Sequence, residues 1–465
     1  MKKQELIELG VPDGEAIGMA FVASAMAAGS GLDKFQIKNK IRELTSDPSA
    51  MLNDRVFGEL AKYLVEASLA EANKEPPKPS APWANFGVDI DKNAEEQMRN
   101  ACGIPVAVAG ALMPDAHLGY SMPIGGVIAV KNAVVPSYVG YDIACRMRLT
   151  VVDLPIKRIK GDEGKLKKAI EECTRFGVGS EFENPKEHPV MDEDWTFSQI
   201  VNNNKPKAWR QLGSSGSGNH FVEFGTITFD KENLGLKAGV YTAILSHSGS
   251  RGTGGNIAQH YIDLASDLHQ ELPKEMRGLA WLDMDSQEGQ EYWRAMELMG
   301  RYAAACHELI HKGLVKDLKL DVLLEVENHH NFAWKETHNG QEVYVHRKGA
   351  TPAGVGVLGV IPGSMATPGY LVKGKGNPLS LMSASHGAGR KMSRKQTKQI
   401  TTTNSLNRVL EAAGVTLISA GLDESPSGYK DIESVMAAQK DLVEVIAKFE
   451  PKLVKMAPPG GRSED

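Results

Sequence analysis

The chain has 465 residues, of which 42% are hydrophobic and 24% are charged, the composition of an ordinary soluble globular protein. Its formal net charge is −5, so bulk charge does not attract a nucleic acid, and such a partner would need a local basic surface. The four cysteines show no CxxC spacing, which excludes a disulfide framework and fits a reducing compartment. The acidic N-terminus is not a secretory signal, and the longest apolar stretch, residues 16–28, is too short to span a bilayer. We therefore expect a cytoplasmic protein with no membrane partner.

The first part of the chain predicts a small helical region over residues 1–74, because apolar residues in 57–69 recur at helical spacing. The segment 75–82 reads Glu-Pro-Pro-Lys-Pro-Ser-Ala-Pro, and such a proline cluster is typical of a stiff extended connector. This linker marks the expected boundary between an N-terminal extension and a catalytic domain over residues 83–465.

Beyond the linker, short runs rich in β-branched residues alternate with helical patterns. The expected strands are 106–108, 127–130, 147–152, 221–224, 241–245, 322–326 and 342–346. The expected helices are 95–101, 291–318 and 431–448. Helices and strands interleave without a regular strand–helix–strand rhythm, so a doubly wound sheet is not indicated. We expect an α+β fold, a mixed core of β-sheets packed with helices.

One short motif suggests a zinc metalloprotease. Residues 307–311 read His-Glu-Leu-Ile-His on a long expected helix, with two histidines one turn apart and a glutamate base. Such an enzyme also needs a third ligand, and the nearest candidates, Glu325 and Glu327, lie in a strand-like run. The motif is short, so a zinc metalloprotease ranks third among the interpretations, behind the two that are given below.

The most informative feature is a series of polar residues in turns bounded by glycine or proline. These turns cover residues 114–117, 140–145, 216–220, 246–252, 328–331 and 383–390. One buried histidine is usually a hydrogen-bonded core residue, but several such turns favour a site, because sites are built where strands end. A carboxylate, a thiolate and several imidazoles suit a borderline divalent metal such as zinc, manganese or cobalt. Asp142 and Cys145 are three residues apart, so one turn can aim both at one ion.

This ordered series of motifs resembles the RtcB family of RNA ligases. The motifs include Pro-Asp-x-His-x-Gly-Tyr, Val-Gly-x-Asp-Ile-x-Cys, Gly-Ser-Gly-Asn-His-Phe, His-x-Gly-Ser-Arg-Gly and Ser-His-Gly-Ala-Gly-Arg, and the resemblance covers residues 95–456. It implies an RtcB-like fold and an enzyme that joins an RNA 3′-phosphate, often formed from a 2′,3′-cyclic phosphate, to a 5′-hydroxyl. It also implies dependence on GTP and on Mn²⁺, with two ions.

The resemblance also implies roles for individual residues. His386 matches the histidine that attacks the α-phosphate of GTP and carries GMP. The implied metal ligands, among which Cys145 bridges two ions, are Asp142, Cys145, His220, His247 and His330. The implied nucleotide contacts, besides His386, are Asn219, Glu223, Ser364, Tyr429 and Lys455. Glu223 suits a guanine reader, because a carboxylate can accept two hydrogen bonds from the N1 and N2 edge of guanine.

Several cations lie in or beside the motifs and are expected to hold RNA phosphates through salt-sensitive contacts. They are Arg251, Arg347, Lys348, Arg390 and Arg394. Two of them belong to a basic run over residues 390–398, which by itself would be read as a solvated helix face. The expected partners are RNA, such as cleaved tRNA, GTP and an activating protein cofactor.

The chain departs from the family pattern at several positions. Arg146 stands where the family has a glycine after the cysteine, Gly369 where a nucleotide-contacting serine is common, and Pro352 where an arginine is usual. We hypothesise a divergent member dedicated to RNA repair, with tRNA splicing as the other setting. Arg146 adds a side chain next to the metal, so it also supports an alternative, an RNA- or nucleotide-binding paralogue with weak or lost ligase activity.

Overall fold

The computed structural model describes residues 1–72, 80–87, 89–273 and 276–460. The chain forms two compact units, Met1–Lys78 and Pro79–Asp465. Most of the expected linker, residues 75–79, lies outside the described residues, so the linker and the domain boundary stay predictions. None of the helices in the described part of the chain is long and apolar enough to cross a membrane.

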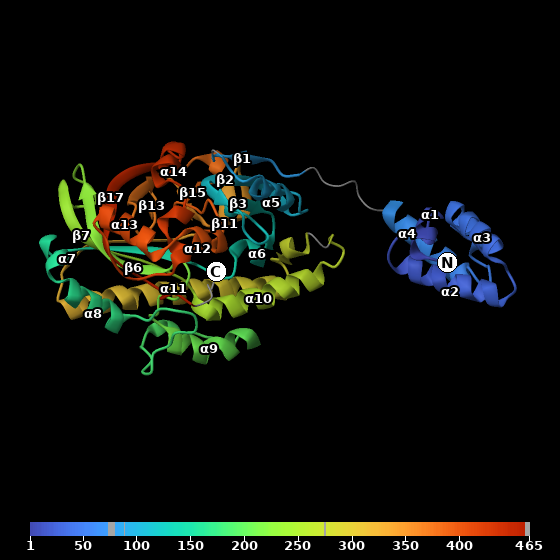
Figure 1. Cartoon of the computed structure of the whole chain (residues 1–465), viewed down its shortest axis with the longest axis horizontal. Coiled ribbons are helices and arrows are strands. Elements are labelled where there is room, and N and C mark those ends of the chain that lie inside the picture. Colours follow the sequence, from blue (N-terminus) through green and yellow to red (C-terminus); the bar gives the residue numbers. More distant parts are fainter. Residues whose placement is uncertain (73–79, 88, 274–275, 461–465) are drawn as a thin grey trace. The chain divides into compact units, whose positions relative to one another are not determined.

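The first unit is helical, as expected (Figure 1). Its helices are α1 (Lys3–Glu8), α2 (Glu15–Gly29), α3 (Lys34–Ser46) and α4 (Gly58–Ala72). The unit buries a hydrophobic core of its own, in which Leu6, Ile41 and Phe57 are almost fully enclosed. A capping box starts α3, where Asp33 accepts from the backbone N–H of Gln36 and the Gln36 side chain accepts in return.

The second unit is built around an eight-stranded sheet with the order β13-β14-β17-β6-β7-β5-β9, in which β16 also pairs with β17. The strands are β5 (Arg146–Val152), β6 (Phe221–Phe229), β7 (Gly239–Ser248), β9 (Val322–His329), β13 (Leu358–Ile361), β14 (Gly369–Gly374), β16 (Thr416–Ser419) and β17 (Val443–Met456). The amide of Asn328 in β9 bonds both backbone groups of Val360 in β13, so one side chain joins the two ends of this strand order. The long helix α11 (Gln287–Leu318) packs against β5 and β7.

A second sheet has five strands in the order β1-β2-β3-β11-β10. They are β1 (Trp83–Asn85), β2 (Ala107–His117), β3 (Ile124–Val130), β10 (Asn331–His338) and β11 (Gln341–Lys348). Two short ladders pair β12 (Ala350–Pro352) with β15 (Ser383–Ser385), and β4 (Ala133–Val134) with β8 (Leu282–Asp283). The chain passes from the first sheet to the second through His330, the single residue between β9 and β10.

The remaining helices lie around these sheets (Figure 1). They are α5 (Lys92–Cys102), α6 (Pro136–Val139), α7 (Lys157–Gly161), α8 (Glu163–Cys173), α9 (Gln199–Gln211), α10 (Arg251–Leu268), α12 (Arg394–Ile400), α13 (Thr403–Ala413) and α14 (Ile432–Ala438). The α+β fold class is confirmed, and each expected strand overlaps an observed one.

One expected element is wrong in its second half. The helix predicted over 431–448 ends at Ala438, and β17 begins at Val443 and pairs with β14 and β6. Val443, Val445 and Ile446 are β-branched and fit a pleated surface, so long-range pairing with the neighbouring strands prevails over the local helical spacing.

Candidate functional site

The five expected metal ligands converge at one edge of the eight-stranded sheet. Cys145 directly precedes β5 and His220 directly precedes β6, while His247 lies near the end of β7 and His330 follows β9. Neighbouring strands in this part of the sheet are antiparallel, so two starts and two ends fall at the same edge. Asp142 reaches the same point from the turn that leads into β5.

The ligand atoms are close enough to share metal ions. Cys145 Sγ lies 3.0 Å from His247 Nε2 and 3.4 Å from His220 Nε2. His247 Nε2 lies 3.2 Å from His330 Nε2, and Asp142 Oδ2 lies 3.1 Å from His220 Nε2. The atoms form two groups, Asp142-Cys145-His220 and Cys145-His247-His330, which share the thiol. This arrangement fits two ions with Cys145 between them.

The hydrogen-bond partner of the His247 imidazole supports a metal site. His220 Nδ1 lies 3.0 Å from the carbonyl oxygen of Ser215, and His247 Nδ1 lies 3.3 Å from that of Asn219. A carbonyl oxygen only accepts hydrogen bonds, so we infer that Nδ1 of His247 carries the proton and that its Nε2 turns a lone pair towards the cluster. His220 Nδ1 also lies 3.2 Å from Nη1 of Arg251, which only donates, so the inference is made for His247 alone. Metal-bound histidines are commonly held by this kind of contact.

Burial strengthens the case. Burial lowers the pKa of His247 and of His330 well below the ordinary value, so both imidazoles are neutral, as metal ligands must be. Asp142 Oδ2 and His330 Nδ1 are buried without a hydrogen-bond partner among the described residues. Converging lone pairs in a dry interior are costly unless a cation sits among them. The donor set therefore fits a bound divalent ion.

The tight turn that connects β7 to α10 holds the carboxylate of Asp142. Asp142 Oδ1 accepts a hydrogen bond of 2.9 Å from the backbone N–H of Ser250. A Cβ atom at Gly249 would lie 2.0 Å from the same oxygen, so only glycine permits this approach. This explains the glycine of the His-x-Gly-Ser-Arg-Gly motif.

His386 lies beside this cluster, with its ring centroid 4.8 Å from that of His330. Its Nδ1 is 2.7 Å from Oδ2 of Asp115, which also accepts from the backbone N–H groups of His386 and Gly387 at 3.2 and 3.3 Å. Burial by itself would raise the pKa of Asp115, but the hydrogen bond and charge of His386 outweigh it and lower that pKa. The carboxylate therefore holds the proton on Nδ1 and leaves the Nε2 lone pair available.

The sequence did not single out Asp115 as the partner of His386, because the two residues are 271 positions apart. The strand register shifts between Leu112 and His117 in β2, and this irregularity turns Asp115 towards β15. The only sequence signal was the presence of Asp115 in one of the polar turns.

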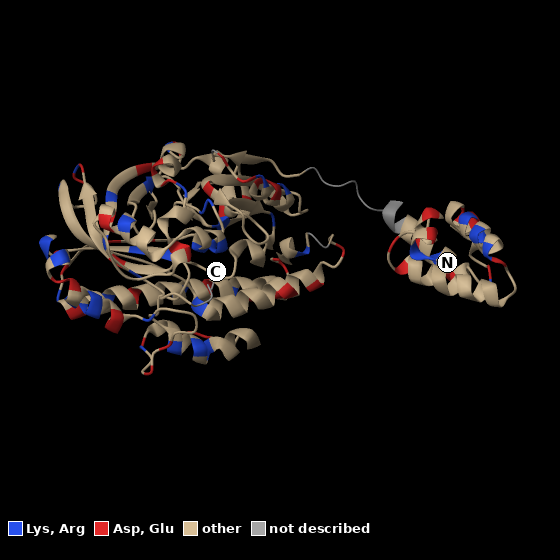
Figure 2. Cartoon of the chain, viewed as in Figure 1, with Lys and Arg blue, Asp and Glu red and all other residues tan. Residues whose placement is uncertain are grey.

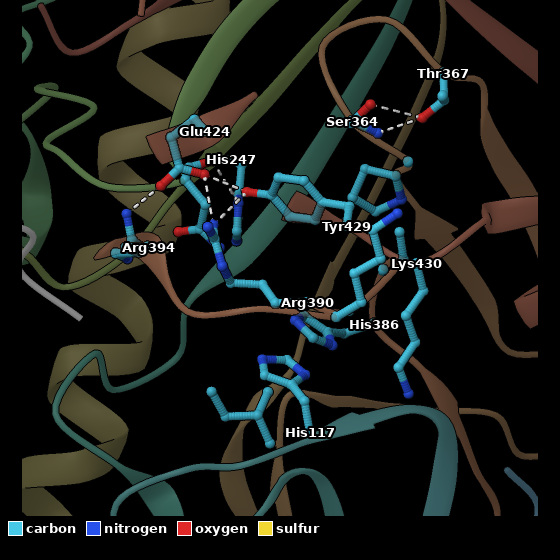
Figure 3. A pocket seen from close by; sticks show the side chains of 18 of the residues that line it. His117, His247, Ser364, Thr367, His386, Arg390, Arg394, Glu424, Tyr429 and Lys430 are labelled. Carbon is cyan, nitrogen blue, oxygen red and sulfur yellow. Dashed lines mark hydrogen bonds and ion pairs between the residues drawn. The ribbon is translucent and has the colours of Figure 1, made fainter. Parts of the chain in front are cut away.

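A pocket of about 900 Å³ opens beside His386 (Figure 3). Besides His386, the expected nucleotide contacts that line it are Asn219, Glu223, Ser364 and Tyr429. Lys455 does not line it. Side chains alternate along β17, so Val454 and Met456 face the pocket while Lys455 faces away and pairs with Glu171 at 3.1 Å.

One wall of the pocket contains a carboxylate that sequence reasoning missed. Glu424 is 3% exposed and pairs with Arg390 at 3.2 Å, with Arg394, and with the hydroxyl of Tyr429, which donates to it (Figure 3). The carboxylate of Glu424 therefore holds Tyr429 and Arg390 in place, although these two residues come from different segments of the chain. His117 and Lys430 also line the pocket and were not expected there.

Three of the five cations expected to contact RNA are buried. Arg251 is 4% exposed and donates to Ser214 Oγ at 3.2 Å, and Arg347 is 1% exposed and pairs with Glu336 at 2.6 Å. Neither guanidinium is presented to solvent, so these residues hold the fold around the site. Lys348, Arg390 and Arg394 line the pocket, but Lys348 is 8% exposed and its Nζ donates to the carbonyl oxygen of Ser137 at 3.1 Å. Burial lowers the pKa of Lys348 to about 8.

Arg146 does not enter the metal cluster. It is the first residue of β5, and its guanidinium donates to Gly300 O at 2.8 Å and pairs with Glu327 at 3.2 Å. Successive residues of a strand point to opposite faces, so Arg146 turns away from the face that Cys145 occupies. The expected interference of this side chain with the metal site is wrong, and the lost-activity alternative loses its support.

The metalloprotease interpretation is also wrong. His307 Nδ1 and His311 Nε2 both lie against the hydroxyl of Ser246, at 2.6 and 2.8 Å, in the interface between α11 and β7. Glu308 lies on another face of the helix, where it pairs with Lys312 and His188. Among the described residues, neither histidine belongs to a group that could hold a metal.

Comparison with known proteins gives one consistent result. The sequence profile of the family described as tRNA-splicing ligase RtcB matches residues 97–199 and 190–456. The chain is 33% identical to the RNA-splicing ligase RtcB of Escherichia coli strain K12, over 77% of this chain and 93% of that protein. It is 32% identical to the tRNA-splicing ligase RtcB of Nanoarchaeum equitans, over 78% and 92%. It is 29% identical to the RNA-splicing ligase RtcB homolog 1 of Entamoeba dispar, over 79% and 83%.

Proposed function

The chain belongs to the RtcB family of RNA ligases, and on this basis we propose that it joins RNA 3′-phosphate or 2′,3′-cyclic phosphate ends to 5′-hydroxyl ends, using GTP and Mn²⁺. The observation that carries the proposal is the Asp115–His386 pair, which lies beside a five-ligand cluster and opens into a pocket of about 900 Å³. His386 and one of the five proposed ligands, His247, line this pocket, which supports a nucleotide site beside both. The proposed setting is RNA repair or tRNA splicing in the cytoplasm.

The first proposed step is attack by His386 Nε2 on the α-phosphorus of GTP. An N–P bond forms, the bond to the bridging oxygen breaks, and pyrophosphate leaves. Asp115 stabilises the positive charge that develops on the imidazole, as a buried carboxylate does for a catalytic histidine. A 2′,3′-cyclic phosphate end is first hydrolysed: water attacks its phosphorus, the bond to the 2′-oxygen breaks, and the 2′-oxygen takes the proton. In the second step an oxygen of the RNA 3′-phosphate attacks the phosphorus of the bound GMP and frees His386. In the third, the 5′-hydroxyl attacks the RNA phosphorus, loses its proton and displaces GMP.

The ligands proposed for Mn²⁺ are Asp142, Cys145, His220, His247 and His330. When bound, such ions neutralise phosphate charge and orient in-line attack. The mixed N, O and S donors suit a borderline divalent metal, and the two groups that share Cys145 support two ions rather than one.

Glu223 is the proposed reader of the guanine base. It is 5% exposed, and burial raises its pKa well above the ordinary value. The N1 and N2 groups of guanine donate hydrogen bonds, so they would stabilise the ionised carboxylate, whereas adenine presents an acceptor at N1. Asn219, Ser364 and Tyr429 line the same pocket and are proposed to contact the nucleotide.

RNA phosphates are proposed to bind at the mouth of the pocket. Lys391 and Lys395 are exposed and line the pocket together with the half-buried Arg390 and Arg394. These cations give a net acidic protein the local basic surface that RNA binding requires.

An end-specific ligation assay tests the proposed function. With Mn²⁺ and GTP, the chain is expected to join RNA carrying a 3′-phosphate or a 2′,3′-cyclic phosphate to RNA carrying a 5′-hydroxyl. A 3′-hydroxyl substrate should give no product, because it offers no phosphate oxygen to accept the nucleotide. ATP in place of GTP should reduce the product, because adenine cannot donate from N1 to Glu223. Joining of 3′-hydroxyl ends, or no joining under any metal, would refute the proposal.

Asp115→Asn is expected to lower the rate of transfer of GMP to the enzyme by about 10²- to 10⁴-fold. An amide in this place can donate to Nδ1, which favours the proton on Nε2 and removes the attacking lone pair. The measurement is the single-turnover rate with GTP labelled at the α-phosphate, and nucleotide affinity should change little. A fall in affinity with an unchanged rate would contradict this role.

A further inference from the structure

The N-terminal unit carries an apolar groove that the ligase chemistry does not use. The match to the family profile begins at residue 97, so this unit lies outside the residues that the profile covers. The groove has a volume of about 570 Å³ and lies between α2 and the segment that leads into α4. Its apolar lining includes Met19, Val22, Met26, Leu52 and Val56.

The outer face of α2 is apolar and open to solvent. Val22 is 62% exposed, Met26 is 50% exposed, and Leu52 on the facing segment is 43% exposed. After Glu15, α2 contains no Lys, Arg, Asp or Glu, and Figure 2 shows the helix uncharged over most of its length. Contiguous exposed apolar surface of this kind marks an interaction site, because leaving it in water is unfavourable.

The spacing on α2 matches a helix-binding groove. Ala16, Ala20, Ala23 and Ala27 face the core of the unit. Gly18, Val22 and Met26 recur every four residues, so they form a stripe on the opposite side. The thioethers of Met19 and Met26 can adapt to the side chains of a partner.

The charges around the groove select the partner. Glu15, Asp54 and Glu59 line it, and Arg55 is the one cation among its lining residues. An acidic rim repels phosphate, and an apolar floor offers RNA no hydrogen-bond donors. A second copy of the chain would bring two acidic rims together. A basic amphipathic partner gains favourable electrostatic contacts with the acidic rim and buries its apolar side chains against the floor.

We propose that this groove docks a basic amphipathic helix of a partner protein. The helix would place apolar side chains at positions i, i+4 and i+7 along the stripe of α2, with Lys or Arg beside Glu15 and Glu59. The chain would thereby hold a second protein through a unit that does not contain the candidate site. This inference does not depend on the proposed function.

The test is fluorescence anisotropy of the full-length chain with a labelled peptide of about 18 residues, or about five helical turns. The peptide carries leucines at helical spacing and lysines on the flanks, and a matched peptide has glutamate in place of each lysine. Saturable binding of the lysine peptide, and much weaker binding of the glutamate peptide, are expected. Val22→Asp with Met26→Asp should weaken binding at least about tenfold. Both side chains are half exposed or more, so the unit should keep its helical circular dichroism.

A variant with reversed charges separates charge-specific recognition of the peptide from non-specific hydrophobic binding. Glu15→Lys with Glu59→Lys should weaken the lysine peptide and strengthen the glutamate peptide. Glu43→Lys, on α3 outside the groove lining, is the matched control and should change neither. All three variants should keep the helical circular dichroism of the unchanged chain. Equal binding of both peptides would overturn the proposal, as would a dimer of the chain that Val22→Asp dissociates.

Discussion

His386→Ala is expected to retain no label when the protein is incubated with Mn²⁺ and GTP labelled at the α-phosphate and is then denatured. The unchanged chain should retain it. Nε2 of His386 is the proposed source of the lone pair that forms the N–P bond, and the methyl group of alanine supplies none. We expect at least about a 10³-fold loss of adduct and of ligated RNA, as removal of other enzymatic nucleophiles causes. A phosphoramidate is stable in alkali and labile in acid, so the adduct of the unchanged chain should show both properties.

His260→Ala is the matched control for this experiment. His260 is an exposed histidine on α10 and does not line the pocket, so the same substitution there should leave the adduct intact. Undiminished labelling of His386→Ala would show that another residue is the nucleophile. His117, which also lines the pocket, would then be the next candidate.

Cys145→Ala is expected to impair both metal positions at once. Cys145 belongs to both ligand groups, whereas Asp142 and His330 each belong to one. Affinity for Mn²⁺ should therefore fall at least about 100-fold, since removal of even a supporting partner of a metal ligand costs 10- to 100-fold. The adduct should be lost with the metal. Metal content by mass spectrometry and titration by electron paramagnetic resonance give the stoichiometry, and Asp142→Ala should lose fewer ions than Cys145→Ala.

Cys102→Ala provides the control for the thiol. Cys102 is a buried cysteine on α5, and burial raises its pKa to about 12, so it remains a neutral apolar side chain. Its replacement should leave metal content unchanged. Full metal stoichiometry in Cys145→Ala, with unchanged affinity, would contradict a shared ligand.

The sequence was informative where residue type and local spacing carry the chemistry. The turn motifs carried the family resemblance that implied the five ligands and His386, and the structure brings these five residues together. The strands were recognisable because runs of β-branched residues with a period of two suit a half-buried sheet. The segment 439–448 was misassigned, because its helical spacing is local while its pairing with β6 and β14 is not.

What the sequence determined by itself was the fold class, the residue types of the metal cluster and the family. Only the tertiary structure decided which charged side chains reach the site. Arg347 and Arg251 are cations beside motifs, yet burial against Glu336 and Ser214 removes them from solvent. Asp115 is the partner of His386 because the fold places β2 next to β15. The direction in which a side chain points and its degree of burial depend on contacts between distant segments. The order of residues along the chain does not reveal these contacts.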